Sequence, residues 1–282
     1  MRNTVLNLPH TTLTIPIALA KEANLSLPLP FIFRSIIGLN LKKLVCIAKN
    51  TECENCIYKE NCVYATAFDE ADVHPTIINA EPFFEHKTEN AKLIIMLLGE
   101  FSKYADYYVQ ALKENERFGV GKERIPYSVK SEEIQIVHGE WNFAEELHSG
   151  NVSIALQTPL RFKAHGKYDC SFSELDFILC LHRRCQKLCS LYGKNNFEGK
   201  YTFENKWKII ERNLKWQKIQ RWSSKQKQTM PFGGITGNLT LQGEFSEYEI
   251  TLFKFATLFN AGKNTNFGMG RIAIRYDDTV SS

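Results

Sequence analysis

The pattern of apolar and polar positions in the first half of the chain predicts strands and helices in the order β-α-β-β-α-β. Residues 3–17 alternate as a strand does, and Pro28-Leu29-Pro30 introduces a helix over 31–45. Further strands are expected at 76–80, 91–98 and 134–138, with a helix at 101–113. This order is that of a ferredoxin-like domain.

The second half approximates the same order. Strands are expected at 152–163, on either side of Gly233-Gly234, and at 271–276, with helices at 172–192, 203–218 and 246–260. The first of these helices follows a Ser171-x-x-Glu174 capping box and is closed by Gly193. Helical spacing makes its three cysteines, Cys180, Cys185 and Cys189, buried thiols rather than a second metal site.

Chain length fits two domains, because 282 residues allow each half its own core. We expect an α+β fold of two tandem ferredoxin-like domains, residues 1–140 and 151–282, with the boundary at 139–151. No run of eighteen apolar residues and no secretory leader pattern occurs. We therefore expect a cytoplasmic protein without a membrane partner.

Four of the eight cysteines are grouped as Cys46-x6-Cys53-x2-Cys56-x5-Cys62. Two thiolates separated by two residues can bind one ion, and the flanking cysteines can complete a tetrahedral zinc shell; an iron–sulfur cluster would use the same ligands. The segment is too polar to be a core, which speaks against simple buried or oxidation-prone thiols. We predict a structural metal module, most simply zinc, inserted in the first domain at 46–64. Four thiolates leave no position for a metal-bound water, so this metal would have no catalytic task.

Positive charge is uneven, although the formal net charge is only +4. Residues 200–227 contain nine Lys or Arg against two Glu, with three tryptophans interleaved. Cationic side chains neutralise phosphates and aromatic rings stack on bases, so this stretch is a candidate RNA surface. The alternative is a solvated helix whose Trp207, Ile210 and Leu214 face the core.

Three glycines near the C-terminus, in the pattern Gly262-x5-Gly268-x-Gly270-Arg271, follow a predicted helix and precede a predicted strand. They allow a tight turn and a close backbone approach, here to a phosphate backbone; a helix C-cap followed by a turn is the alternative. The pattern resembles the glycine-rich loop of the RAMP superfamily of CRISPR-associated RNA-binding proteins. Upstream lie an Arg-Trp-Ser-x-x-Gln segment at 221–226, Pro231-Phe232-Gly233-Gly234, and a strand at 156–163. Together, over 152–276, these motifs resemble the CRISPR precursor-RNA processing endoribonucleases.

This resemblance implies CRISPR repeat RNA as the substrate and metal-independent cleavage. The ribose 2′-hydroxyl would attack the adjacent phosphate, leaving a 2′,3′-cyclic phosphate and a 5′-hydroxyl; other CRISPR effector subunits are implied as further partners. In related enzymes a first-helix histidine takes part, but Leu39-Asn40-Leu41 stands there in this sequence. His74 is the nearest substitute, unless it is an ordinary loop histidine, and Tyr64, Lys42 and Lys43 are lesser candidates.

Candidate RNA-binding residues lie around the glycine loop, in the basic stretch and at the start of the first helix. They are Arg34, Arg221, Lys225, Lys227, Gly262, Lys263, Gly268, Gly270 and Arg271. Two other functions fit the same residues. One is a non-catalytic RAMP subunit that binds guide RNA in an effector complex, and the other is a zinc-containing nucleic-acid-binding regulator.

Overall fold

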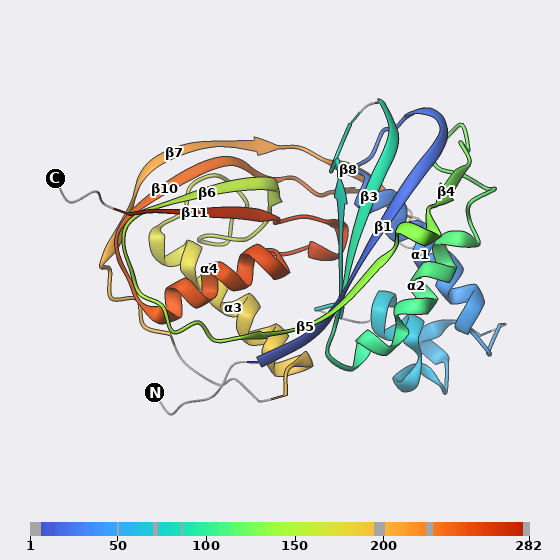
Figure 1. Cartoon of the computed structure of the whole chain (residues 1–282), viewed down its shortest axis with the longest axis horizontal. Helices are drawn as coiled ribbons and strands as arrows, with labels where there is room; N and C mark the ends of the chain where they lie inside the picture. The colour runs from blue at the N-terminus through green and yellow to red at the C-terminus, as the bar shows by residue number, and fades with distance from the viewer. Residues whose placement is uncertain are drawn as a thin grey trace. The chain divides into compact units, whose positions relative to one another are not determined.

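The computed structural model describes residues 7–49, 51–69, 73–85, 87–194, 201–223 and 228–278. Within them the chain divides into two compact units, Leu8–Glu140 and a second that joins Asn7 to the residues from Trp141 onward. Each unit carries an antiparallel sheet and two main helices (Figure 1). None of the helices in the described ranges is long and apolar enough to cross a membrane.

The N-terminal unit has the predicted β-α-β-β-α-β order. Its elements are β1 (Asn7–Asn24), α1 (Leu29–Val45), β2 (Thr76–Glu81), β3 (Lys87–Leu98), α2 (Ala105–Lys113), β4 (Tyr127–Val129) and β5 (Gln135–Asn142). The strand order is β2-β3-β1-β4, and β5 also pairs with β1. The strand that completes the ferredoxin-like order is therefore β4, which the sequence reading omitted in favour of 134–138.

Alternation on β1 and the apolar stripe of α1 together make the core of this unit. Leu13, Ile15 and Ile17 of β1 are buried, and Phe33 and Ile37 of α1 belong to the same cluster. Pro30 fits the first turn of α1 because a backbone N–H there would lack an intrahelical partner. The helix α1 is thereby fixed against the sheet, and its polar face is left for other contacts.

The C-terminal unit repeats this architecture. Its elements are β6 (His148–Leu160), α3 (Glu174–Tyr192), β7 (Trp207–Gln217), β8 (Gln220–Ser223), β9 (Gln228–Pro231), β10 (Gly234–Phe245), α4 (Glu247–Phe259) and β11 (Ile272–Asp278). The sheet order is β11-β6-β10-β7, with all three pairings antiparallel, and β8 and β9 form a separate hairpin. Helices α3 and α4 lie along one face of this sheet (Figure 1). Both units are thus ferredoxin-like, as predicted.

The predicted helix at 203–218 is wrong, because residues 207–217 form the edge strand β7. Its pairing with β10 shifts register between Thr240 and Leu241, so Ile210 is the additional residue of a β-bulge. A bulge interrupts the two-residue alternation. Along the sequence, Trp207, Ile210 and Leu214 therefore show the spacing of a helix. In the strand, Ile210 is 47% exposed and does not join a buried stripe.

The capping box of α3 lies two residues beyond the predicted one. Ser173 and Asp176 exchange the two bonds: Asp176 N–H donates to Ser173 Oγ at 3.1 Å, and Ser173 N–H donates to Asp176 Oδ2 at 2.9 Å. Phe172, just before the cap, packs on Phe177 with ring centroids 6.1 Å apart. This hydrophobic staple fixes where the helix begins.

Candidate functional site

A row of two stacked aromatic rings with a cation at each end lies along the polar face of α1. The Arg34 guanidinium stands 4.9 Å from the centroid of Phe68, and Lys42 Nζ stands 5.3 Å from the centroid of Tyr64. The two rings are stacked, with centroids 5.7 Å apart and planes 10° from parallel. Arg34, Lys42 and Tyr64, three residues singled out in the sequence, are therefore brought together through Phe68, which no sequence motif marks.

His74 lies close enough to this row to be influenced by its charge. Burial, aided by the positive charge of Arg34, lowers the pKa of His74 to about 4. The imidazole is accordingly neutral at pH 7 and can accept a proton. Burial, opposed by the positive charge of Lys42, raises the pKa of Tyr64, so its phenol stays protonated.

Asn40 occupies the part of α1 where a histidine was sought, and it has a structural task. Its amide donates to Ile36 O at 3.1 Å and to Asn115 Oδ1 at 3.4 Å, while Lys43 Nζ donates to its oxygen at 3.2 Å. Its neighbour Leu39 is 67% exposed. Asn40 thus links α1 to the turn after α2.

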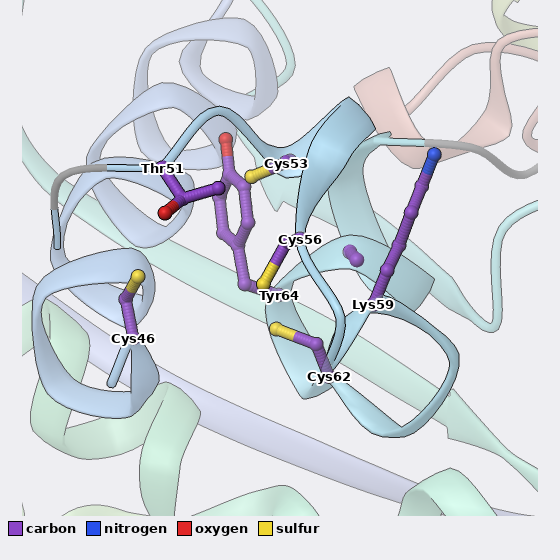
Figure 2. A pocket seen from close by; sticks show the side chains of 8 residues that line it. Cys46, Thr51, Cys53, Cys56, Lys59, Cys62 and Tyr64 are labelled. Carbon is purple, nitrogen blue, oxygen red and sulfur yellow. The ribbon is translucent and has the colours of Figure 1, made fainter. Parts of the chain in front are cut away.

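The four grouped cysteines line one pocket, together with Thr51, Lys59, Tyr64 and Ala65. In Figure 2 the thiols of Cys56 and Cys62 point toward one another, Cys53 lies beside the Tyr64 ring, and Cys46 stands apart at the end of α1. All four are half-exposed. Within the described ranges, no three His, Cys, Asp or Glu side chains are arranged to hold a single metal ion.

The three glycines of the C-terminal loop all adopt positive φ: 72° at Gly262, 72° at Gly268 and 74° at Gly270. A Cβ at Gly270 would overlap the Ala261 carbonyl oxygen, and one at Gly262 would press on the Arg161 carbonyl oxygen. The close approach that these two glycines permit is therefore to the protein's own backbone.

Hydrogen bonds tie the same loop to the end of β6. Lys263 N–H donates to Arg161 O at 2.8 Å, Gly270 N–H to Pro159 O at 3.0 Å, and Arg271 N–H to the Thr158 hydroxyl at 2.8 Å. Residues 265–270 are buried, while the Lys263 side chain is exposed and that of Arg271 is half-buried. The loop thus presents the Lys263 side chain to solvent, while its backbone over 265–270 is buried.

Arg184 of α3, which sequence reasoning did not find, holds this loop to α4. Its guanidinium donates to Asn260 O at 3.0 Å, to Phe259 O at 3.1 Å and to the Thr265 hydroxyl at 2.7 Å. These groups lie at and just after the C-terminus of α4, where carbonyls lack intrahelical donors. Burial lowers the pKa of Arg184 to about 10, so the side chain stays charged at neutral pH.

Cations and aromatic rings also surround the loop. Arg221 of β8 stands 5.0 Å from the centroid of Phe267. Arg161 donates to Gly233 O at 2.6 Å and lies 4.0 Å from the centroid of Tyr168. Lys225 and Lys227 fall outside the described residues. The surface around β6, β8 and the glycine loop therefore carries cations and rings of the kinds that bind phosphates and bases.

Comparisons with known proteins agree with this architecture. Thermus thermophilus Cas6 superposes with a TM-score of 0.58 at 14% identity, over 95% of this chain and 99% of that one. The same Cas6 in a product complex gives 0.60 at 14% identity, over 94% and 100%. A Cas6-related protein from Pyrococcus furiosus gives 0.53 at 13%, over 94% and 98%. At these identities the matches show the shared fold.

Two protein-family models match the sequence of this chain. Residues 8–154 match the AF_1859_N N-terminal domain, and residues 154–272 match the CRISPR-associated endoribonuclease Cas6. No curated protein sequence matches the chain. The second match contains the second half of β6, the β8–β9 hairpin and the glycine loop, and so covers most of the stretch in which the ordered motifs were found. Residues 154–272 therefore form a domain of the CRISPR-associated endoribonuclease Cas6 family.

Proposed function

We propose that this chain cuts CRISPR precursor RNA within the repeat by a reaction that needs no metal ion. The ribose 2′-hydroxyl attacks the neighbouring phosphate, the bond to the 5′ oxygen breaks, and the products carry a 2′,3′-cyclic phosphate and a 5′-hydroxyl. The observation that carries this proposal is the gathering of Arg34, Lys42, Tyr64 and His74 on one side of α1, in a chain whose residues 154–272 match the Cas6 endoribonuclease.

Each group has a role that suits this reaction. The neutral imidazole of His74 accepts the proton of the 2′-hydroxyl, and Arg34 stabilises the negative charge that builds on the phosphate. Tyr64 donates a hydrogen bond or proton toward the leaving 5′ oxygen, with Lys42 held above its ring. Bound phosphate would favour the protonated form of His74 and so raise its pKa from about 4.

We assign RNA binding to the C-terminal unit. Lys263, Arg271 and Arg221 would neutralise phosphates, and the buried loop backbone would hold these cations in place. The same assignment extends to Lys225 and Lys227. Because the substrate is an intracellular transcript, we place the protein in the cytoplasm. A related structure is a Cas6-RT-Cas1–Cas2 complex, which motivates a search for bound CRISPR-associated subunits here as well.

The test is incubation of purified protein with repeat RNA from its own CRISPR array in excess EDTA. A single cut with a 2′,3′-cyclic phosphate end is expected. The exposure to EDTA is kept brief, and the unfolding temperature is measured in the same buffer, so that loss of structure is not mistaken for loss of chemistry. Tight binding without a cut by folded protein would indicate a guide-RNA-binding subunit instead.

Substitutions test the roles of the individual residues. His74→Ala should lower the cleavage rate about 100-fold or more, because the general base is removed. Tyr64→Phe keeps the ring contacts with Phe68 and Lys42 and removes only the hydroxyl. The matched control is His165→Ala, an exposed histidine of the C-terminal unit. An unchanged rate in His74→Ala would remove His74 from the mechanism.

A further inference from the structure

The structure points to a four-thiolate metal centre formed by Cys46, Cys53, Cys56 and Cys62, which we propose is structural and separate from RNA cleavage. Its ligand would be a thiophilic metal, either a single zinc ion or an iron–sulfur cluster, because both take four cysteine thiolates.

The described part of the cysteine segment buries very little of its own apolar surface. Its two short 3-10 turns, Cys53–Asn55 and Lys59–Asn61, contain no buried residue. Its apolar side chains face solvent: Ile47 is 74% exposed and Ile57 is 87% exposed. A segment of this kind cannot offset its conformational entropy by burial, so another cross-link must supply the stability.

The four cysteines also converge on one pocket. Cys46 at the end of α1, Cys53 and Cys56 at the two ends of the first turn, and Cys62 directly after the second turn all line the same pocket (Figure 2). Cys56 N–H donates to Cys53 O at 3.3 Å, and Cys62 N–H donates to Lys59 O at 3.1 Å. Each of these two turns presents a thiol to the pocket, as a ligand loop does.

The spacing of the thiols bears on the metal. One zinc ion needs four sulfurs about 2.3 Å from it, hence about 4 Å from one another. The described arrangement does not provide this for any three of them. Zinc binding would therefore draw all four thiols closer together, whereas an iron–sulfur cluster, which is larger, would bridge a wider separation with less movement.

The place of the centre explains why it would be structural. Four thiolates close the coordination shell of either metal, so no site remains for substrate or water. The pocket wall includes Tyr64, and the ammonium group of Lys42 lies over the ring of that tyrosine. Metal binding would thereby fix one end of the cation–aromatic row without taking part in the reaction.

Thiol counting tests the proposal without any RNA, so its outcome is independent of the proposed cleavage. Five cysteines are half-exposed, the four of the segment and Cys170, while Cys180, Cys185 and Cys189 are buried. In protein purified anaerobically, a water-soluble thiol reagent should react quickly with Cys170 alone. A mercurial, which bonds to thiolates more tightly than zinc or iron does, should then take up the four other thiols and release the metal into a chelator.

Metal analysis of the same samples decides the identity. One zinc per chain, or about four iron and four sulfide with visible charge-transfer absorption, would each support the site. The double variant Cys53→Ser/Cys56→Ser should lose the metal, and Cys170→Ser, the matched control, should keep it. Limited proteolysis should then cut within 46–62 only in the metal-free forms. Five fast-reacting thiols in native protein without zinc or iron would overturn the proposal, as would metal retained by the double variant.

Discussion

The glycine loop and the cysteine segment are both short and both rich in residues that motifs are built from, yet they are stabilised in opposite ways. The loop buries residues 265–270 and is bonded to β6 and to Arg184. The cysteine segment exposes its isoleucines and buries nothing in its two turns.

This difference separates two kinds of motif. Gly262 and Gly270 are required by the protein's own backbone, so their presence is no direct evidence of a ligand. The four cysteines satisfy no such internal requirement, so their grouping is evidence of one. A motif is therefore evidence for a ligand only when packing and hydrogen bonding within the protein do not already account for its residues.

The largest expected effect is a loss of stability when Gly270 of the glycine loop is replaced. Gly270→Ala should lower the free energy of unfolding by about 4 kcal/mol, because a Cβ overlaps the Ala261 carbonyl at a positive φ. The control is Gly166, which has φ 79° and no atom within 4 Å of its Cβ position. Gly166→Ala should cost only about 1 kcal/mol in the same urea titration. Equal costs would mean that the loop is not packed as described.

A second effect concerns the clamp on that loop. Arg184→Ala should cost about 3 kcal/mol of unfolding free energy, because two carbonyls and a hydroxyl lose their donor. The adjacent Arg183 is exposed, and Arg183→Ala should change the same free energy by less than about 0.5 kcal/mol. If both variants unfolded like the parent, the loop would not depend on α3.

A third effect tests whether His74 is buried beside Arg34 in the protein without RNA. The folded-state pKa of His74, about 4, lies below the unfolded value near 6.5, so the unfolded chain binds the proton more readily. Stability should therefore fall as the pH drops from 6.5 to 4, by up to about 3 kcal/mol. His74→Gln should flatten that part of the urea-measured profile. An identical slope in the variant would show that His74 titrates normally.

The smallest effect expected is on RNA affinity, when a cationic side chain of the loop is removed and the loop backbone is kept. Lys263→Ala and Arg271→Ala should each weaken binding of repeat RNA a few-fold and reduce the salt slope by about one, as loss of one phosphate contact does. Lys122→Ala, an exposed lysine of the N-terminal unit, is the control. Unchanged salt slopes in both loop variants would remove the loop from the RNA surface.

Much of the fold could be predicted because periodicity and capping are local. The helix after Pro28-Leu29-Pro30 was placed within two residues of α1. The failures have local causes as well. A bulge at Ile210 masks the alternation of β7, and β4 has only three residues, too few to show a period. Two Ser-x-x-acid boxes overlap before α3, and the contact of Phe172 with Phe177 selects the second.

The site was harder to predict because its parts meet only in three dimensions. Cysteine spacing identified the segment, and the structure brings all four thiols to one pocket. No sequence signal marks Phe68 as the ring that joins Arg34 to Tyr64. Nor does any signal mark Arg184, since its carbonyl partners lie about 75 residues further along the chain.

The most direct test of the account is cleavage, in EDTA, of two repeat RNAs that differ only by a 2′-deoxy sugar at the cut site. We predict that the unmodified RNA is cut to a 2′,3′-cyclic phosphate, and that the deoxy RNA is bound equally well and left intact. Cleavage of the deoxy RNA, or cleavage only when a divalent metal is added to folded protein, would contradict it.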